Sequence, residues 1–500
     1  MAYTFTNNSC NPWLDRTAPC TIGSHVVYAI NATDPTHLQR GISFAKRHNI
    51  RLVIRNTGHD YLGRSTGAHS LALWTRNLRS MELLDYRSSV YTGPAIMMGA
   101  GVLAIEAYRF ADSHNVVVVG GNCPSVGMTG GYAQGGGISL LSSVYGLGAD
   151  QVLEWTVITA DGELVTANST HHPDLYWALR GGGGGTFGVV VSMTVKVFPD
   201  TYTSSAAITV PDNGANIDAI YAAFKAFITT QLPTLVDRGI YIPWVLTPAG
   251  FHLEARIAAG LHKDELDGLL QPTLSILEDA QLEYNYSSFE TPTFLGTYEG
   301  APGASNVSDY VTGGRLISRS ALQSDPDGLV AALRHIGSQA FLTGVSFNVN
   351  TTRSGMSPDE VAANPYFRES IFNLFFGLPI DYQDWDINLA RMDKITNDDL
   401  NQLEKVAPNG GAYLNEADIA QPDFQSVFYG NHYPRLERIK QRYDPDGVFY
   451  AKTAVGSERW EERENGRLCK VKAPERNVGD KVVKYSERCD LLWDYRTRRG

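Results

Sequence analysis

The sequence of 500 residues contains only five cysteines and no long apolar run. A membrane-spanning helix needs about 20 consecutive apolar residues, so we expect no membrane partner. The formal net charge is −11, and a negative chain is a poor match for the phosphate backbone of nucleic acids. The chain also lacks the Gly-x-Ser-x-Gly elbow of many hydrolases and the phosphate-binding loop of nucleoside triphosphatases. These absences favour a globular protein that acts on a small molecule.

The few cysteines predict two disulfides and one unpaired thiol. Cys10 and Cys20 can form a short loop, Cys469 and Cys489 can form a second, and Cys123 is left over. The N-terminus shows no apolar segment of a signal peptide. Disulfides nevertheless favour an oxidising compartment, so we expect secretion or maturation in the secretory pathway. The glycosylation sequons agree with this expectation; they stand at Asn7, Asn31, Asn168, Asn285, Asn306 and Asn350.

Glycine, in contrast, is abundant, with 48 residues. Two glycine-rich loops each hold one nucleophilic side chain: residues 55–67 read RNTGHDYLGRSTG with His59, and residues 120–137 read GGNCPSVGMTGGYAQGGG with Cys123. Glycine lets the backbone take a positive φ and bring its N–H groups close to a ligand. The N–H groups from Gly58 to Ser65 are candidates for a pyrophosphate cradle. A thiolate at Cys123 can attack an electron-poor ring, so the two loops predict an enzyme with a large cofactor gripped at two points.

Simpler interpretations stay open for each loop. His59 alone can be a solvent-facing histidine, and Cys123 alone can be a small buried residue. The first loop does not match the dinucleotide fingerprint of a Rossmann fold. His171 and His172 lack partners at zinc-binding spacing, so we expect no metal site. The run Gly181–Gly185 fits either a tight turn or a close approach to a cofactor.

The pattern along the chain predicts a mixed α+β protein. Strands are expected at 25–30, 51–55 and 95–101, with a helix that begins at Asp34-Pro35. A hairpin is expected to turn at Asp161-Gly162. After Pro199 amphipathic helices alternate with strands to about residue 420. The last residues, rich in charge of both signs, are predicted to be a solvated extension.

The segment GGAYLNEAD, residues 410–418, offers Tyr413 and Glu416 as polar side chains of interest. If the segment is a strand, residues three apart face opposite sides. An ordinary polar strand is therefore the alternative to a catalytic role for this pair.

These motifs resemble those of the berberine bridge enzyme-like oxidases, within the vanillyl-alcohol oxidase and p-cresol methylhydroxylase group of flavoproteins. The resemblance rests on R-x-x-G-H-D at 55–60, C-P-S-V-G at 123–127 and the segment FYGNHYPRLERIKQRYDPDGVFY at 428–450. It implies a two-domain α+β flavoprotein in which an antiparallel sheet with helices covers the substrate. The implied parts are an FAD-binding domain (1–203), a substrate domain (204–420), a C-terminal segment that returns to the FAD domain (421–460) and a charged tail (461–500).

The resemblance also implies FAD attached twice, through His59 to the ring methyl carbon and through Cys123 to the adjacent ring carbon. Reduced flavin would be reoxidised by dioxygen to give hydrogen peroxide. In relatives, a small residue at the position of Val126 is associated with access of oxygen to the flavin. The other residues implied at the cofactor are Arg55, Asn56, Thr57, Gly58, Asp60, Tyr61, Leu62, Gly63, Ser65, Gly121, Gly127, Gly130, Gly131, Gly135, Gly136, Gly185, Val189, Tyr429 and Tyr433.

For catalysis the resemblance implies Tyr413 as the base, since a tyrosine of the matching segment lies over the flavin in relatives. Glu416 is the second candidate. A tyrosine has a reference pKa of about 10, so it needs a charged neighbour to act as a base. Two positions depart from the family pattern: Ile138 replaces a His or Tyr after the triple glycine, and His432 replaces an Asn.

The implied reaction is a two-electron oxidation of a small organic molecule, by alcohol oxidation or by C–H oxidation with desaturation or ring closure. We expect a secondary metabolite as substrate and a monomeric enzyme. One alternative is a carbohydrate oxidase that acts on an anomeric hydroxyl. A second alternative is a flavoprotein scaffold without redox turnover. The apolar Ile138, where many relatives have a polar residue, is the feature that supports this alternative.

Overall fold

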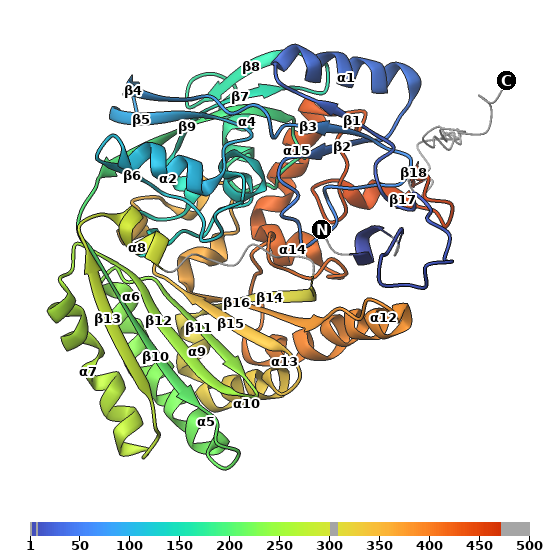
Figure 1. Cartoon of the computed structure of the whole chain (residues 1–500). Helices are drawn as coiled ribbons and strands as arrows, with labels where there is room; N and C mark the ends of the chain where they lie inside the picture. The colour runs from blue at the N-terminus through green and yellow to red at the C-terminus, as the bar shows by residue number, and fades with distance from the viewer. Residues whose placement is uncertain (1–2, 7–8, 301–308, 472–500) are drawn as a thin grey trace, which may run out of the picture.

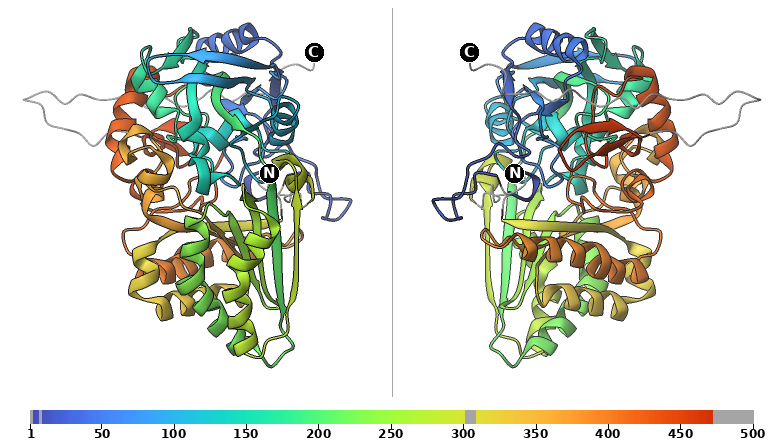
Figure 2. Two further views of the ribbon diagram at one scale, coloured as in Figure 1. Left: turned by 90° about the vertical axis from the view of Figure 1, so that its left-hand side faces the viewer. Right: turned by 90° about the vertical axis from the view of Figure 1, so that its right-hand side faces the viewer.

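The computed structural model describes residues 3–6, 9–300 and 309–471. The chain forms two lobes, one above the other (Figures 1 and 2). The N-terminal part and the C-terminal part share the upper lobe, and the middle of the chain forms the lower lobe. Within the described ranges no helix combines the length and apolarity that a membrane crossing needs.

A small parallel sheet lies at one side of the upper lobe. Its order is β1 (Tyr28–Asn31), β3 (Leu71–Trp74), β2 (Leu52–Arg55). Helix α1 (Pro35–His48) begins where predicted, because the Asp34 carboxylate accepts a hydrogen bond from the N–H of Thr36 and proline occupies the first helical position. The buried face of α1, which includes Leu38 and Ile42, packs against this sheet.

A larger sheet completes the upper lobe, with the order β4-β5-β9-β7-β8 and with β6 paired to β9. The predicted hairpin is confirmed, since β7 and β8 are antiparallel and Gly162 takes a φ of +83° in the turn between them. The strands and helices are β4 (Met81–Arg87), β5 (Thr92–Gly99), β6 (Val116–Val118), β7 (Val152–Ile158), β8 (Leu164–Asn168), β9 (Val189–Pro199), α2 (Ala104–Asp112), α3 (Ser142–Tyr145) and α4 (Pro173–Ala178).

The lower lobe is built on a seven-stranded antiparallel sheet, ordered β13-β10-β12-β11-β15-β16-β14. Its strands are β10 (Thr203–Pro211), β11 (Ile242–Thr247), β12 (Gly250–Ala259), β13 (Asn285–Thr291), β14 (Tyr310–Ser318), β15 (Phe341–Ser346) and β16 (Ser370–Pro379). Its helices are α5 (Ile217–Ala226), α6 (Leu232–Asp237), α7 (Lys263–Asp279), α8 (Phe294–Gly300), α9 (Arg319–Ser324), α10 (Pro326–Gly337), α11 (Thr351–Ser354), α12 (Trp385–Lys394) and α13 (Leu400–Val406).

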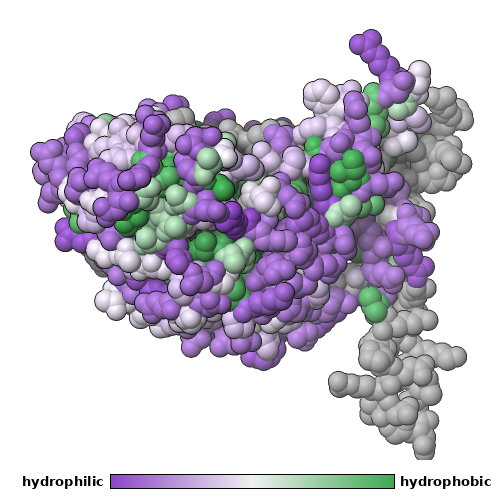
Figure 3. Space-filling model, turned by 90° about the horizontal axis from the view of Figure 1, so that it is seen from below, coloured by the Kyte–Doolittle hydropathy of each residue, from purple (hydrophilic) through white to green (hydrophobic). Residues whose placement is uncertain are grey.

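One face of this sheet packs against helices and the other turns toward the upper lobe (Figure 1). Trp244 and Phe372 are fully buried on the helical side, in a core that they share with Phe224 of α5. Seen from below, the outer surface of this end is mostly hydrophilic with small hydrophobic groups (Figure 3). The face of the sheet that is not covered by helices contributes side chains to the junction between the lobes.

The C-terminal segment returns to the upper lobe through α14 (Phe424–Tyr429) and α15 (Tyr433–Tyr443). Phe449 then pairs in parallel with Leu52 of β2. The buried ammonium group of Lys440 donates hydrogen bonds to the carbonyl oxygens of Thr186 and Phe449, both at 2.6 Å. The first residues of the predicted charged tail form a hairpin of β17 (Trp460–Glu462) and β18 (Leu468–Lys470). The predicted domain boundaries stay predictions.

The structure tests several smaller expectations. The disulfide between Cys10 and Cys20 is confirmed. Cys489, which we predicted as the partner of Cys469, lies outside the described residues, as do the sequons at Asn7 and Asn306. The strand interpretation of residues 410–418 is wrong. This segment is a turn, closed by a 2.8 Å hydrogen bond from the N–H of Glu416 to the carbonyl oxygen of Tyr413.

One ion pair joins the lobes at their junction. Both guanidinium nitrogens of Arg368, just before β16, donate to the Asp150 carboxylate at 2.7 and 2.9 Å. The two side chains are only 5% and 1% exposed. Removing one partner of a buried pair leaves the other charge uncompensated.

We therefore expect Asp150→Asn to lower the free energy of unfolding by about 3–5 kcal/mol, measured by thermal and denaturant unfolding. The matched control is Asp85→Asn, which breaks the exposed pair with Arg87 and should change stability by less than about 1 kcal/mol. Equal effects of the two variants would contradict the assigned role of the buried pair.

Candidate active site

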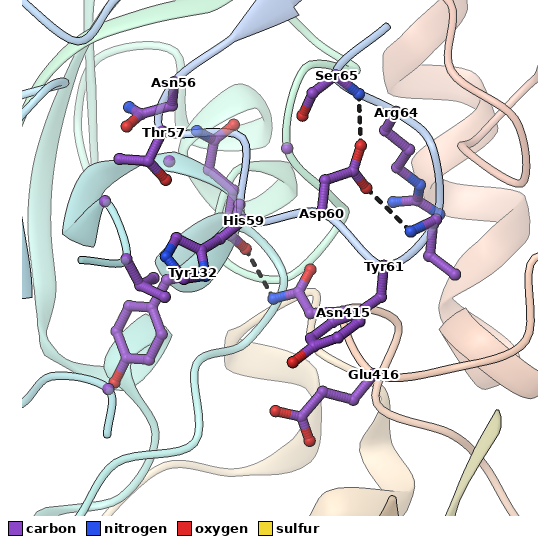
Figure 4. A pocket seen from close by; sticks show the side chains of 18 of the residues that line it. Asn56, Thr57, His59, Asp60, Tyr61, Arg64, Ser65, Tyr132, Asn415 and Glu416 are labelled. Carbon is purple, nitrogen blue, oxygen red and sulfur yellow. Dashed lines mark hydrogen bonds between the residues drawn. The ribbon is translucent and has the colours of Figure 1, made fainter. Parts of the chain in front are cut away.

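A cavity of about 410 Å³ lies where the two glycine-rich loops, the turn at 413–416 and the sheet of the lower lobe meet. Figure 4 shows polar side chains of both loops and of the turn around it. The sequence-predicted residues that line it are Asn56, Thr57, Gly58, His59, Asp60, Tyr61, Leu62, Ser65, Gly121, Cys123, Val126, Gly127, Gly130, Gly131, Gly185, Tyr413 and Glu416. Both predicted nucleophiles and both catalytic candidates therefore share one cavity.

Seven predicted residues do not line this cavity. Arg55 lines an adjoining surface pocket that also touches His59. Val189 belongs to a hydrophobic core, and the hydroxyl of Tyr429 donates to the carbonyl oxygen of Thr453 at 2.9 Å. The hydroxyl of Tyr433 donates to the Glu458 carboxylate. The other three are Gly63, Gly135 and Gly136.

The first loop is organised by its own aspartate. The Asp60 carboxylate accepts hydrogen bonds from the N–H groups of Leu62 at 2.9 Å and Ser65 at 2.6 Å (Figure 4). Two N–H groups of the predicted pyrophosphate cradle are thus already used. Gly58 has a φ of +80°, and a Cβ there would approach a guanidinium nitrogen of Arg55 to 2.9 Å. The positive φ therefore favours glycine at this position.

His59 lies in the cavity wall with its Nε2 atom 2.7 Å from the Ser125 hydroxyl oxygen. Burial lowers the pKa of its imidazole, which favours the neutral ring, the form that can act as a nucleophile. Cys123 is half-buried and is a free thiol. Burial and, after it, the negative charge of Glu416 raise the pKa of that thiol to about 11. Burial thus favours the reactive neutral form of His59 but disfavours the reactive thiolate form of Cys123.

Five buried polar atoms of residues along the cavity have no hydrogen-bond partner within the described part of the chain. They are Asn56 Oδ1, Asn122 Oδ1, Thr129 Oγ1, Tyr132 Oη and Gln134 Oε1. An unpaired buried polar group costs about 1–3 kcal/mol, and native proteins rarely leave one without a reason. Their gathering around one cavity indicates a ligand rich in hydrogen-bonding groups.

Tyr413 lies in a polar niche. The Asn415 side-chain amide donates to its hydroxyl oxygen at 2.9 Å and to the carbonyl oxygen of Gly131 at 2.8 Å. Burial, and then the charge of Glu416, raise the pKa of Tyr413, whereas hydrogen bonds from Asn415 and from the backbone N–H groups of Ile138 and Gly137 lower it. The apolar side chain at position 138 thus does not deprive this oxygen of donors, because the backbone supplies them.

Glu416 is a half-buried carboxyl group in the same wall. Its Oε2 atom accepts a 2.8 Å hydrogen bond from the Asn373 amide. Burial raises the pKa of Glu416 to about 7, against an ordinary value of 4.5. The group is therefore poised to hold a proton below neutral pH and to release it above.

The wall opposite the loops comes from the antiparallel sheet of the lower lobe, as the resemblance implied, but the residues of this wall were not foreseen from the sequence. On β15, Phe341, Thr343 and Val345 line the cavity, while the residues between them are buried toward the helices. This alternation of half-buried and buried residues is the strand periodicity of two. In the sequence, that periodicity was the signal that could have identified the cavity-facing residues of β15. Tyr241 and Phe375 complete an aromatic and apolar surface.

Comparisons with known proteins agree with this geometry. The family model described as FAD binding domain matches residues 27–168, and the one described as berberine and berberine like matches residues 412–456. The FAD-linked oxidoreductase sor8 of Hypocrea jecorina (strain QM6a) is 42% identical over 476 residues, covering 94% of this chain and 82% of that protein.

Two solved structures extend the comparison. The crystal structure of the VAO-type flavoprotein MtVAO615 from Myceliophthora thermophila C1 has a TM-score of 0.88 at 36% identity and covers 94% of this chain and 87% of its own. The glucooligosaccharide oxidase from Acremonium strictum, described with a 6-S-cysteinyl, 8α-N1-histidyl FAD, has a TM-score of 0.69 at 18% identity, covering 87% and 92%. The predicted flavoprotein fold and oxidoreductase class are confirmed.

The raised pKa of the half-buried Glu416 carboxyl predicts a pH-dependent stability. Because its pKa is raised from 4.5 to about 7 on folding, its stabilising contribution is fully present below pH 4.5 and is lost as the pH rises through 7. Glu416→Gln should therefore unfold like the parent at pH 4.5 and be more stable by up to about 3 kcal/mol above pH 8.

Thermal unfolding of both proteins between pH 4.5 and 8.5 checks this. The exposed Glu163→Gln serves as the control and should track the parent throughout. A constant difference between Glu416→Gln and the parent across this range would show that the carboxyl group does not change its proton occupancy on folding.

Proposed function

The chain belongs to the berberine-like family of FAD-linked oxidoreductases among the VAO-type flavoproteins, and we propose that it oxidises a small organic molecule by two electrons with dioxygen as acceptor. The observation that carries the proposal is one cavity that combines two nucleophiles, five unsatisfied polar atoms and the Tyr413 niche. The assignment as an FAD-linked oxidoreductase follows from the family. The reaction, the electron acceptor and the covalent attachment of FAD are what we propose.

The residues present fit an isoalloxazine ring with a polar side chain. Asn56, Asn122, Thr129 and Gln134 carry the unsatisfied atoms that the ring edge and the ribityl hydroxyls would pair with. Bound FAD supplies the site with an acceptor for a hydride. We propose that FAD is attached through both His59 and Cys123. The family resemblance and the shared cavity support this, and the remote relative described with both linkages has the same fold.

Tyr413 is the proposed base that takes the substrate proton as hydride leaves. A phenolate at this position would be stabilised by the Asn415 amide and by the N–H groups of Ile138 and Gly137. These three donors act against burial and the Glu416 charge, which together still keep the pKa of Tyr413 above its ordinary value. A redox-silent scaffold has no need for donors gathered on a tyrosine oxygen, so this niche favours an active oxidase.

The substrate surface favours a compact, largely apolar molecule. Phe341, Val345 and Phe375 give apolar contacts, and Thr343 and Glu416 offer hydrogen bonds. No tryptophan is found among the described residues that line the cavity. Tyrosines such as Tyr61 and Tyr241 do line it, so the preference for a secondary metabolite over a carbohydrate rests on the apolar contacts of Phe341, Val345 and Phe375. The Cys10–Cys20 disulfide supports maturation in the secretory pathway.

The two-point attachment is tested by intact mass after acid denaturation. We expect the parent, His59→Ala and Cys123→Ala each to retain the mass of FAD, because one remaining bond suffices to hold it. The double variant should release it. Free FAD from the parent would contradict covalent attachment. A colourless parent protein to which FAD does not bind would contradict the flavoprotein assignment itself.

The role of Tyr413 is tested by the rate of flavin reduction in the absence of oxygen. Substrates would first be found by peroxide release from a panel of benzylic and allylic alcohols and of oligosaccharides. Loss of a general base slows proton transfer by about 10²–10⁴-fold, so we expect Tyr413→Phe to reduce the rate by about that factor. Tyr284→Phe, which removes an exposed hydroxyl bonded to Glu278, is the control. Unchanged reduction in Tyr413→Phe would exclude it as the base.

A further inference from the structure

One carboxyl group in the wall of the cavity has no cation as a partner. Glu416 lines the cavity, and its Oε2 atom accepts the 2.8 Å hydrogen bond from the Asn373 amide. Its other oxygen, Oε1, accepts no hydrogen bond from the described residues, and none of their ion pairs includes Glu416. A carboxylate taken out of water is unfavourable unless it is paired. The missing partner is therefore a group that a ligand can bring.

The support of Glu416 comes from the lower lobe. Asn373 lies on β16 and is fully buried, and its Oδ1 atom has no hydrogen-bond partner in the described ranges. Its amide turns a donor toward Glu416, which suits an ionised carboxylate because that group only accepts. Two acceptors at this place, Glu416 Oε1 and Asn373 Oδ1, thus lack donors. A protonated amine carries donors and no acceptor, so it is the complementary group.

The arginines around the cavity are bound elsewhere. Arg64 of the first loop donates to carbonyl oxygens of the C-terminal return segment at 3.1 and 3.2 Å. Arg256 of β12 donates to the Glu254 carboxylate at 3.0 Å. Burial and the charge of Glu416 raise the pKa of four neighbouring groups, Tyr61, Cys123, Tyr241 and Tyr413. None of these four groups is a cation.

Aromatic rings stand in the same wall as this carboxyl group. Tyr61 packs against Phe375 of β16 with ring centroids 5.0 Å apart, and Phe375 packs against Phe341 of β15 at 5.6 Å. All three rings line the cavity, and Figure 4 shows the side chains of Tyr61 and Glu416 pointing to the same side. Aromatic faces attract cations as well as apolar groups. A carboxylate together with such rings suits an organic ammonium ion.

The place of Glu416 separates it from the groups assigned to the cofactor. The five unsatisfied polar atoms belong to the two glycine-rich loops of the upper lobe. Glu416 is instead bonded to Asn373, two residues before Phe375 on the strand that forms part of the substrate wall. Its carboxyl group is therefore available to the substrate.

We propose that Glu416 is a specificity-determining residue that binds a protonated amine, and that the substrate is an amine with an apolar or aromatic body. This inference rests on the proposed oxidation of a small molecule in this cavity. The ammonium group pairs with the Glu416 carboxylate, and the body of the substrate lies against Phe341 and Phe375. Glu416 thus anchors the substrate and leaves proton removal to Tyr413.

The test compares three ligands that share one carbon skeleton and differ in charge: phenethylamine, phenethyl alcohol and phenylacetate. Their dissociation constants for the purified protein are measured by isothermal titration calorimetry at pH 8 in the absence of oxygen. A hydrogen bond to a charged group changes affinity by about 10- to 100-fold. We therefore expect phenethylamine to bind at least about tenfold more tightly than the alcohol, and phenylacetate to bind most weakly.

Three variants assign this preference to one side chain. Glu416→Gln keeps the shape and removes the charge, so the amine should lose about tenfold or more in affinity while the alcohol changes little. Glu163→Gln, at an exposed position, should bind all three ligands like the parent. Glu416→Lys reverses the charge and should bind phenylacetate more tightly than the parent does. Such a gain cannot come from damage to the fold.

The pH dependence of binding gives a second test. Burial raises the pKa of Glu416 to about 7, so the carboxylate is mostly ionised at pH 8 and mostly protonated at pH 6. The amine stays protonated at both. We expect phenethylamine to bind about tenfold more weakly at pH 6, and Glu416→Gln to abolish this difference. Any effect of His59 would remain in that variant. The raised pKa values of Cys123 and the neighbouring tyrosines keep those groups neutral in this range.

The outcomes are distinguishable. Phenethylamine that does not bind, or that binds no more tightly than the alcohol, overturns this proposal. A preference or a pH dependence that survives in Glu416→Gln also overturns it. Calorimetry reports binding whether or not flavin is attached or reduced. Failure of the proposed function therefore appears in the intact mass and in flavin reduction, whereas failure of the amine site appears in the affinities alone.

Discussion

The structure depends most on a cavity whose walls are polar and incompletely paired. Unsatisfied atoms of Asn56, Asn122, Thr129 and Gln134 face one space between the lobes. Leaving them without partners would cost several kcal/mol in sum, an amount comparable to the net stability of a domain. A bound cofactor that satisfies them therefore contributes to holding the fold together as well as to its chemistry.

The two lobes divide the work around this cavity. The upper lobe supplies the glycine-rich loops with His59 and Cys123. The C-terminal return segment is held to this lobe by the buried Lys440, which donates to the carbonyl oxygen of Thr186. The lower lobe supplies the substrate wall on β15. The buried pair of Asp150 with Arg368 joins the two lobes. Because the walls of the cavity come from different lobes, the site is complete only when the lobes are docked.

The sequence predicted those features that local chemistry dictates. The α1 cap at Asp34 and the hairpin turn at Gly162 depend on neighbouring residues alone. The grouping of His59 with Cys123 was also predicted, because both lie in glycine-rich loops that follow strands. Short-range patterns such as these determine backbone conformation before tertiary contacts form.

The remaining features depend on contacts between distant segments. Asp60 takes two N–H groups of its own loop, which residue types alone did not reveal. The segment at 413–416, for which a strand was one interpretation, folds as a turn, and its Asn415 amide donates to the carbonyl oxygen of Gly131 in the second glycine-rich loop.

The central claim is that this cavity holds FAD bonded to both His59 and Cys123. A crystal structure of the purified protein tests it most directly. The account predicts flavin density joined to the His59 ring and to the Cys123 sulfur, with ring or ribityl atoms within hydrogen-bonding distance of Asn56 and Gln134. Density for a flavin outside this cavity, or with neither bond present, would contradict it.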